Sequence, residues 1–441
     1  MRTVVLVPVR PGHRSAAGNG GGLAPVIHSP QDRLAESAGL ARAIQLDVVA
    51  EEIVPLPQPR PATLFGSGKV GELATLIGES DVTLAIVDHA LSPVQQRNLE
   101  KAWSCKVLDR TGLILEIFGQ RAATREGRLQ VELAHLTYQK SRLVRTWTHL
   151  ERQRGGFGFL GGPGETQIES DRRMIEERIA RIEAELEKVK RTRKLHRDSR
   201  KRVPYPIVAL VGYTNAGKST LFNRMSRASV LSADMLFATL DPTLRAVELP
   251  QGLRVILSDT VGFISDLPTM LVAAFRATLE EVIEADLILH VRDVSHADAE
   301  AQSLDVEQVL RQLGIAPDDG ARLVEVWNKI DRLDRDANIR LRNRAERQPV
   351  ERRPVLVSAL SGEGIDLLAT EIEARLATRR VTLDLVIDAA DGAGVSWLHR
   401  NTEVMTKVLR DDGALAITVR SDPANAEKVR AKFNASGVPS H

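Results

Sequence analysis

The sequence predicts an α/β protein in which a mostly parallel sheet, covered by helices on both faces, forms the largest of three domains. Short apolar runs such as residues 203–211 (VPYPIVALV) alternate with segments of helical periodicity, which is typical of buried parallel strands. Apolar heptad stripes interrupt this alternation, and strand and helix signals resume on a smaller scale near the C-terminus. We therefore expect an N-terminal α/β domain at 1–127, an antiparallel helical hairpin at 128–203, the main sheet domain at 204–378 and a small C-terminal α/β domain at 379–441.

Apolar runs place four strands in the N-terminal domain. They are expected at residues 3–9, 44–54, 82–88 and 106–109. Residues 13–30 are rich in glycine, serine and alanine and predict a flexible insertion. The sequence FGSGKV at 65–70 resembles a phosphate-binding loop, but Thr63 stands where the first glycine is required. We interpret it as a glycine turn that starts a helix.

Two heptad stripes predict the hairpin, a short antiparallel coiled coil. They are Leu129, Leu133, Leu136, Leu143, Trp147 and Leu150, then Ile168, Ile175, Ile179, Ile182, Leu186 and Val189. The loop between them, 152–165, is too rich in glycine for a helix, and it carries Phe157, Phe159 and Leu160 beside two arginines. Such a loop suits close approach to RNA through stacking and phosphate contact; the alternative is a linker that is glycine-rich for mobility.

The second helix of the hairpin ends in the densest basic run of the chain, VKRTRKLHRDSRKR at 189–202. Basic runs are commonly solvated helix faces. This one lacks the acidic residues that balance the preceding stretch, so we favour contact with RNA phosphates.

The first of four short motifs follows the apolar run that ends at Val211. It reads GYTNAGKS and comprises Gly212, Tyr213, Thr214, Asn215, Ala216, Gly217, Lys218 and Ser219. The glycines let backbone N–H groups surround an anion, Lys218 supplies a charge for the β- and γ-phosphates, and Ser219 supplies a hydroxyl for Mg²⁺. The helix that follows directs its positive end at the same phosphates. A strand, this loop and a helix in that order predict a P-loop nucleotide-binding domain rather than an ordinary glycine turn.

Two further motifs select guanine and make this a G domain. NKID consists of Asn328, Lys329, Ile330 and Asp331, and SAL of Ser358, Ala359 and Leu360; each follows an apolar run. The Asp331 carboxylate can accept hydrogen bonds from guanine N1–H and the 2-amino group, whereas adenine offers neither donor. Asn328 is expected to tie the loops together and the stem of Lys329 to cover one face of the base. A backbone N–H of SAL could contact the guanine carbonyl.

The motif DTVG serves the γ-phosphate. It consists of Asp259, Thr260, Val261 and Gly262, and the preceding segment contains Phe237, Ala238, Thr239, Leu240 and Asp241. Asp259 suits a carboxylate that holds a water on Mg²⁺, and the Gly262 N–H would reach the γ-phosphate. We assign Thr239 as the threonine that joins Mg²⁺ in the GTP state, with Thr243 as its rival. Loss of the γ-phosphate is expected to release both loops.

Ras-like proteins place a glutamine after the glycine of this motif, where it orients the attacking water. Here the residue is Phe263. We therefore expect slow intrinsic hydrolysis, roughly 10⁻⁴ to 10⁻³ s⁻¹, and stimulation by a partner, a rearranged loop or a monovalent cation. Asn215 is a candidate K⁺ ligand, or else merely caps the loop. The candidate catalytic residues are Lys218, Thr239 and Asn215.

Composition limits the remaining classes. The 441 residues carry a net charge of +2, so any contact with nucleic acid depends on local basic clusters. The single cysteine, Cys105, excludes an intramolecular disulfide framework and fits a reducing cytoplasm. No apolar run reaches membrane-spanning length, and the apolar run at the N-terminus is too short for a signal peptide. We expect the protein to be a monomer.

The motifs together resemble the HflX branch of the translation-factor-class GTPases. Four segments carry the resemblance: 110–136, 155–173 (GGFGFLGGPGETQIESDRR), 237–243 (FATLDPT) and 259–268 (DTVGFISDLP). It implies a cytoplasmic GTPase that binds the 50S subunit and separates stalled 70S ribosomes under stress. It also implies that the hairpin reaches towards the peptidyl-transferase region, that the ribosome stimulates hydrolysis, and that Ser219 and Thr239 ligate Mg²⁺. Some relatives use ATP to unwind RNA, but no second nucleotide motif supports that activity here.

Two other functions remain open at this level. A ribosome-assembly GTPase would share the enzyme class but bind precursor particles. A regulatory GTPase switch would act on a protein effector and ignore RNA.

Overall fold

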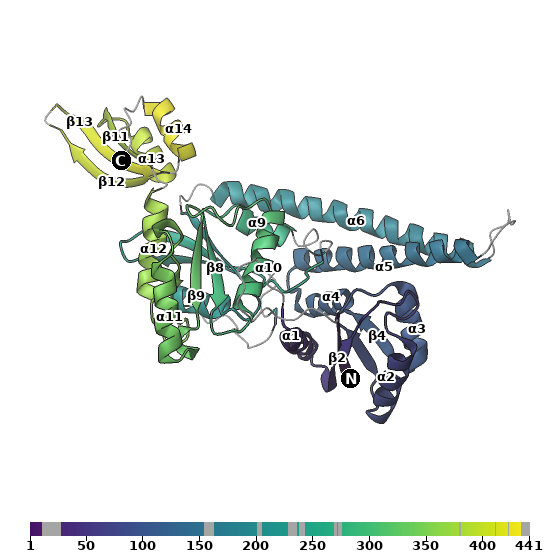
Figure 1. The fold of residues 1–441 in the computed structure, drawn as a ribbon. Coiled ribbons are helices and arrows are strands. Elements are labelled where there is room, and N and C mark those ends of the chain that lie inside the picture. The colour runs from purple at the N-terminus through teal and green to yellow at the C-terminus, as the bar shows by residue number, and fades with distance from the viewer. Residues whose placement is uncertain are drawn as a thin grey trace.

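A computed structural model gives the fold of the chain. The described residues are 1–10, 28–153, 163–200, 205–227, 236–237, 243–268, 271, 276–378, 381–410, 412–421 and 423–433. They form three separate sheets, which define an N-terminal unit (1–121), a central unit (205–378) and a C-terminal unit (381–433). Figure 1 shows the hairpin and the N-terminal unit on one side of the central unit and the C-terminal unit on the other. The α/β class and the three sheets agree with the prediction.

A four-stranded parallel sheet in the order β2-β1-β3-β4 forms the N-terminal unit. Its elements are β1 (Arg2–Val9), α1 (Pro30–Ala43), β2 (Asp47–Pro55), α2 (Ser67–Glu79), β3 (Leu84–Val87), α3 (Pro93–Trp103), β4 (Lys106–Asp109) and α4 (Arg110–Arg121). The glycine turn at 65–70 does start a helix, since Gly66 is the N-cap of α2. Cys105 is a free, half-buried thiol that packs against the core of this unit.

The strands lie within two residues of their predicted bounds except at the start of the second strand, and the expected insertion is also shorter. The second strand begins at Asp47, because α1 extends to Ala43 and Ile44 caps it. Pro30 belongs to α1, whose N-cap Ser29 accepts a hydrogen bond from the Asp32 N–H, so the expected insertion ends before Ser29. Residues 11–27 of that insertion lie outside the described part of the chain.

The hairpin consists of the antiparallel helices α5 (Arg125–Gln153) and α6 (Pro163–Arg200) (Figure 1). Leu129, Ile182 and Leu186 are buried between them, as the heptad stripes predict. The Arg178–Glu132 ion pair, 2.6 Å, bridges the two helices farther along. The tip at 154–162 lies outside the described residues, as do the side chains at 144–168, which include Trp147, Leu150 and Ile168 of the stripes, and those of the basic run at 190 and from 192 onward.

The middle of α5 is fastened to the end of β4. The hydroxyl of Tyr138 donates to Asp109 Oδ1 over 2.7 Å, and Arg142 approaches Oδ2 at 3.3 Å. Asp109 is itself the N-cap of α4, accepting from the Gly112 N–H at 2.8 Å. One buried carboxylate therefore joins the hairpin to the N-terminal sheet.

The central sheet has six strands in the order β10-β9-β8-β5-β7-β6, parallel throughout except for β6 against β7. The strands are β5 (Ile207–Val211), β6 (Thr243–Glu248), β7 (Arg254–Asp259), β8 (Leu287–Asp293), β9 (Leu323–Asn328) and β10 (Val355–Leu356). The helices are α7 (Lys218–Ser226), α9 (Arg276–Ile283), α10 (Ala299–Gln312), α11 (Arg335–Glu346) and α12 (Ile365–Thr378). Apolar clusters cover both faces, and every residue of β8 is buried, as the doubly covered sheet of the prediction requires.

Leu267 and Pro268 are not helical, and the described helix α9 ends at Ile283, because Asp286 already donates its N–H to the Ile207 carbonyl at the start of β5. The segment 389–409 is partly helical: it contains α13 (Gly392–Asn401), followed by the strand β12 (Glu403–Leu409). The C-terminal sheet is completed by β11 (Val381–Asp388) and β13 (Ala414–Ser421), with α14 (Pro423–Phe433) against it.

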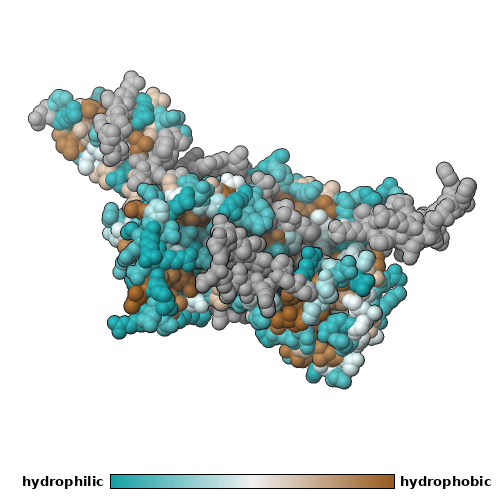
Figure 2. Space-filling model, in the orientation of Figure 1, coloured by the Kyte–Doolittle hydropathy of each residue, from teal (hydrophilic) through white to brown (hydrophobic). Residues whose placement is uncertain are grey.

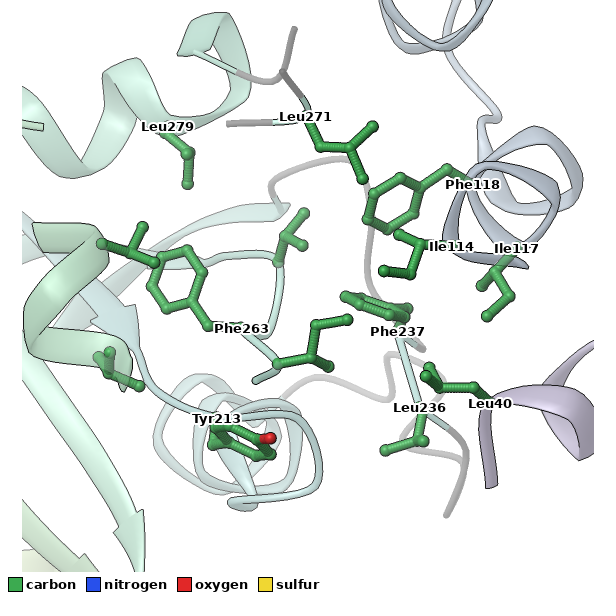
Figure 3. Packing of buried hydrophobic residues seen from close by; sticks show 14 of the residues in the cluster. Leu40, Ile114, Ile117, Phe118, Tyr213, Leu236, Phe237, Phe263, Leu271 and Leu279 are labelled. Carbon is green, nitrogen blue, oxygen red and sulfur yellow. The ribbon is translucent and has the colours of Figure 1, made fainter. Parts of the chain in front are cut away.

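One apolar cluster crosses from the N-terminal unit into the central unit. Figure 3 shows Leu40 of α1 and Ile114, Ile117 and Phe118 of α4 facing Leu236, Phe237 and Leu271 of the central unit. All of these side chains are buried. The surface over α11 and α12 is by contrast predominantly hydrophilic (Figure 2), and among the described residues no helix is long and apolar enough to cross a membrane.

Candidate functional site

The four motifs lie in loops at the carboxyl ends of four parallel strands of the central sheet, where parallel α/β sheets place their ligands. GYTNAGKS follows β5, DTVG overlaps the end of β7, NKID the end of β9, and SAL follows β10. Gly212 needs to be glycine, since its φ is +151° and a Cβ there would lie 2.2 Å from the Val291 carbonyl oxygen. Gly217, at φ +92°, would meet the Asn328 amide at 2.3 Å.

Asn328 brings three of these loops together. Its side-chain Nδ2 donates to the Ala216 carbonyl at 2.8 Å, and its Oδ1 accepts from the Ala359 N–H at 3.0 Å. The side chain is buried, so both bonds are shielded from water. Arg224 of α7 also donates to the Ala359 carbonyl. The phosphate loop and the two guanine loops therefore form one connected surface.

Lys218 lies inside the phosphate loop, where only 6% of it is exposed. Its Nζ donates to the carbonyls of Tyr213 (2.7 Å) and Gly212 (3.1 Å). Burial lowers the pKa of Lys218 to about 8, although the nearby Asp259 carboxylate acts in the opposite direction and Lys329 adds to the lowering. The site thus contains an ammonium group that an anion would stabilise.

Ser219 and Asp259 supply adjacent oxygen ligands. The Ser219 hydroxyl donates to Asp259 Oδ2 at 2.7 Å, and Asp259 is completely buried at the end of β7. A hydroxyl and a carboxylate beside a phosphate loop fit the preference of Mg²⁺ for oxygen, with few protein ligands because substrate phosphates provide the rest. Among the described residues no cluster of three or more histidine, cysteine, aspartate or glutamate side chains forms a separate metal site.

The residues that the sequence predicts to select the base differ in their exposure. Lys329 adopts a left-handed conformation (φ 66°) and its Nζ is held by Asp293 Oδ2 at 2.7 Å. Asp331 follows and is exposed, so its carboxylate is accessible to a base. In the SAL loop Ser358 is fully buried, whereas Leu360 is 73% exposed. The structure thus joins Asn328 to Ala359, whereas Leu360 bonds Arg224 of α7 through its carbonyl and leaves its side chain exposed.

Phe263 points away from the phosphate loop and into the apolar cluster, where it is 1% exposed (Figure 3). Its backbone pairs with the phosphate loop: the Phe263 N–H donates to Gly212 at 3.1 Å, and its carbonyl accepts from the Thr214 N–H at 2.7 Å. The Phe263 side chain therefore belongs to the apolar core, and it has no polar atom that could form a hydrogen bond with a water molecule.

Thr239, with Ala238, Leu240 and Asp241, lies outside the described residues, so the structure does not place it. Its neighbour Phe237 is buried in the cluster shared with the N-terminal unit. The rival Thr243 is the first residue of β6. Asn215 is exposed at the outer edge of the phosphate loop, with φ 58°.

Sequence reasoning missed the residues of the N-terminal unit that reach this site. Glu36 of α1 accepts a hydrogen bond from the Tyr213 hydroxyl, and Arg110 of α4 donates to the carbonyl of Ser265 at 2.7 Å. Glu36 and Tyr213 are 177 positions apart, so no local motif could have linked them.

Comparisons with known proteins extend over nearly the whole chain. Family models match in order: GTP-binding GTPase N-terminal (31–119), GTP-binding GTPase Middle Region (121–200), 50S ribosome-binding GTPase (207–329) and HflX C-terminal domain (341–439). The GTPase HflX of Magnetococcus marinus is 49% identical over 408 residues, which is 92% of each chain. That of Escherichia coli K12 is 45% identical over 362 residues, 82% of this chain and 83% of its own. A solved GTP-binding protein of Sulfolobus solfataricus in complex with GDP covers 85% of this chain and 98% of its own at 22% identity, and its TM-score of 0.43 is too low to carry an argument.

Proposed function

This chain belongs to the HflX family of GTPases, and from that premise we propose that it binds the 50S ribosomal subunit in its GTP state and splits or rescues stalled 70S ribosomes under stress. The observation that carries the proposal is the joining of the phosphate and guanine loops by Asn328, which forms a single guanine-nucleotide surface beside a unit that carries a long helical hairpin. GTP and GDP are the ligands of that surface.

Each motif has a defined task in the proposed cycle. The phosphate-loop amides and the Lys218 ammonium hold the β- and γ-phosphates, and charge neutralisation there favours the transition state. Asp331 accepts from the guanine edge, the Lys329 stem covers the base, and the Ala359 region contacts the guanine carbonyl. Gly262 donates its N–H to the γ-phosphate. Because Phe263 is buried, the water must be oriented by another group, which is the reason to expect stimulation by a partner.

Mg²⁺ is the expected cofactor, and it would supply positive charge that neutralises the phosphates. Ser219 and Thr239 are proposed as direct ligands and Asp259 as a ligand through water. Asn215 is the proposed K⁺ ligand. Hydrolysis rates compared in KCl and NaCl test this assignment, and equal rates would refute it.

The hairpin is proposed as the ribosomal contact. Its tip at 152–165 and basic run at 189–202 combine aromatic and arginine side chains with dense positive charge, which suits rRNA. The protein is proposed to act as a monomer in the cytoplasm, where ribosomes are found.

Sedimentation separates this function from its alternatives. Binding to mature 50S and 70S particles with a non-hydrolysable GTP analogue supports ribosome splitting or rescue. Enrichment only on immature particles supports an assembly role, and no ribosomal association at all supports a switch with a protein effector. Light scattering of 70S ribosomes after addition of the protein with GTP, GDP or ATP then tests splitting directly.

The hairpin tip offers a second test. Replacement of residues 155–164 by a serine-rich loop of equal length should leave intrinsic GTP hydrolysis unchanged and abolish its stimulation by ribosomes. A matched exposed change far from the tip, Val350→Ser in the short helix Val350–Arg352, should leave both rates unchanged. Stimulation that survives the loop replacement would exclude the tip as the coupling element.

A further inference from the structure

The hydroxyl of Tyr213, a residue of the phosphate loop, lies between two other parts of the chain. It accepts a hydrogen bond from the backbone N–H of Ser265 at 2.7 Å, just beyond DTVG, and donates one to the Glu36 carboxylate of the N-terminal unit. Tyr213 is 5% exposed and Ser265 is 3% exposed. Burial and the Glu36 charge raise the pKa of Tyr213 well above its ordinary value, so the hydroxyl keeps the proton that it donates.

A buried arginine completes this contact from the same unit. Arg110 Nη2 donates to the Ser265 carbonyl at 2.7 Å and contacts the Ser265 hydroxyl at 2.8 Å, while its other contacts are the carboxylates of Glu36 and Asp88. The Ser265 hydroxyl donates to Glu36 at 3.0 Å. Both backbone polar groups and the side chain of Ser265 are therefore bonded within one buried network.

This network determines where the preceding residues lie. Phe263 is paired with the backbone of Gly212 and Thr214, and Ser265 is held by Tyr213 and Arg110, so both ends of the short 263–265 segment are fixed. Gly262 then lies directly beside the phosphate-loop lysine: a Cβ at this position would be 2.9 Å from Lys218 Nζ. A backbone N–H placed there is close to the charge that would bind a γ-phosphate.

We propose that Glu36, Arg110 and the Tyr213 hydroxyl are positioning residues of the GTPase site, which hold Gly262 beside Lys218 and so favour GTP over GDP. The inference rests on the proposed roles of Gly262 and Lys218. GTP has a γ-phosphate that the Gly262 N–H can bind, whereas GDP has none. The network therefore contributes to the affinity for GTP and not to the affinity for GDP. The N-terminal unit thereby supplies part of the nucleotide discrimination of the central unit.

The test compares the dissociation constants of GDP and a non-hydrolysable GTP analogue for the full-length chain, by calorimetry, in Tyr213→Phe and Glu36→Ala. We expect the analogue to lose about tenfold in affinity in each variant, the cost of an unmade hydrogen bond to a charged group, while GDP affinity stays within about twofold. The single-turnover rate of GTP hydrolysis should also fall in the variants that lose affinity for the analogue. Glu36→Gln, whose amide oxygen can still accept from Tyr213, should recover part of the loss.

Tyr138→Phe is the matched control. Tyr138 also donates its hydroxyl to a carboxylate of the N-terminal unit, the buried Asp109, but it is itself partly exposed and, among the described residues, makes no hydrogen bond to the phosphate loop. We expect the ratio of the GTP-analogue affinity to the GDP affinity to be the same in Tyr138→Phe as in the wild type. An unchanged ratio in Tyr213→Phe and Glu36→Ala, or an equal change in Tyr138→Phe, would overturn the positioning role. Wild-type protein that binds neither nucleotide would instead refute the proposed function.

Discussion

The rings of Phe118 and Phe237 meet edge to face, with their centroids 4.8 Å apart and an interplanar angle of 74° (Figure 3). Phe118 belongs to α4 of the N-terminal unit, and Phe237 lies two residues before the proposed Mg²⁺ ligand Thr239. Phe237 also has a left-handed backbone (φ 56°), which is uncommon for a bulky residue. The segment that leads to Thr239 is therefore anchored in the core of another unit.

Phe237→Ala should destabilise the protein by about 3–5 kcal/mol, because it removes a fully buried ring and an aromatic pair. Urea unfolding followed by tryptophan fluorescence measures the effect. Leu360→Ala, at a residue that is 73% exposed, serves as control and should stay within about 0.5 kcal/mol of the wild type. Equal unfolding midpoints for the two variants would show that the contact between the units contributes no stability.

Nucleotide affinity should fall as the pH rises above 8. Lys218 has a pKa of about 8 because of its burial, and only its protonated form attracts phosphates. Binding of an anion favours the charged form, so GDP binding near pH 8 should take up protons. Calorimetry of GDP binding between pH 7 and 9, in two buffers of different ionisation enthalpy, measures both effects. Affinity that is flat across this range, with no proton uptake, would contradict the assigned role.

Asp331→Asn should shift the preference of the protein from guanine towards xanthine nucleotides. An amide at this position can donate to the xanthine carbonyl but cannot accept two hydrogen bonds from guanine, so GDP affinity should fall by about 10- to 100-fold. Competition between GDP and XDP measures the change. Asp334→Asn is the matched control, since this nearby carboxylate only caps α11 by accepting from the Ala337 N–H. Unaltered GDP preference in Asp331→Asn would remove the basis for guanine selection.

The contact between His28 and α10 should make stability depend on pH. Burial alone would lower the pKa of His28, but its hydrogen bond to Asp305 and the charges of Asp305, Glu36 and Asp298 raise it overall. A raised pKa means that the stabilisation is fully present below about pH 6.5 and is lost as the pH rises through the folded-state value.

Melting temperatures at pH 6 and pH 8.5 test this for wild type and His28→Gln. The wild type should lose more stability between the two pH values than the variant does. His89→Gln, at a partly exposed histidine whose ring bonds the neighbouring Ala90 carbonyl rather than a carboxylate, should behave as the wild type. Parallel pH profiles for wild type and His28→Gln would exclude the ion pair as the cause.

The nucleotide loops could be predicted from the sequence because each motif is local and carries its own chemistry. The spacing of Gly212, Gly217 and Lys218 is fixed by the phosphate loop itself, and the loops fall at strand ends because the strands are apolar runs. The heptad stripes were equally informative, because burial at Leu129 and Ile182 follows from periodicity alone.

The network of Glu36, Arg110 and Tyr213 could not be predicted in this way. A glutamate in a helix and an arginine after a strand are ordinary in sequence, and they become notable only where two units pack and bury them. Phe263 shows the same limit: the sequence reveals that a glutamine is missing, but only the packing shows that the side chain serves the core. The boundary at Ile44 was wrong because Ile44 and Leu46 are apolar residues packed against the core, so the apolar pattern alone does not separate the end of α1 from the strand that follows.

Asp109 and Arg110 are consecutive, and each fastens a different part of the molecule: Asp109 holds the middle of α5 through Tyr138, and Arg110 holds Ser265 beside the phosphate loop. From Tyr138 to its end at Gln153, α5 is about 22 Å long. A tilt of about 5° about this attachment would therefore move that end of the helix by about 2 Å. Conversely, a force on the end of the hairpin would be transmitted to Asp109, and so to the peptide bond that it shares with Arg110.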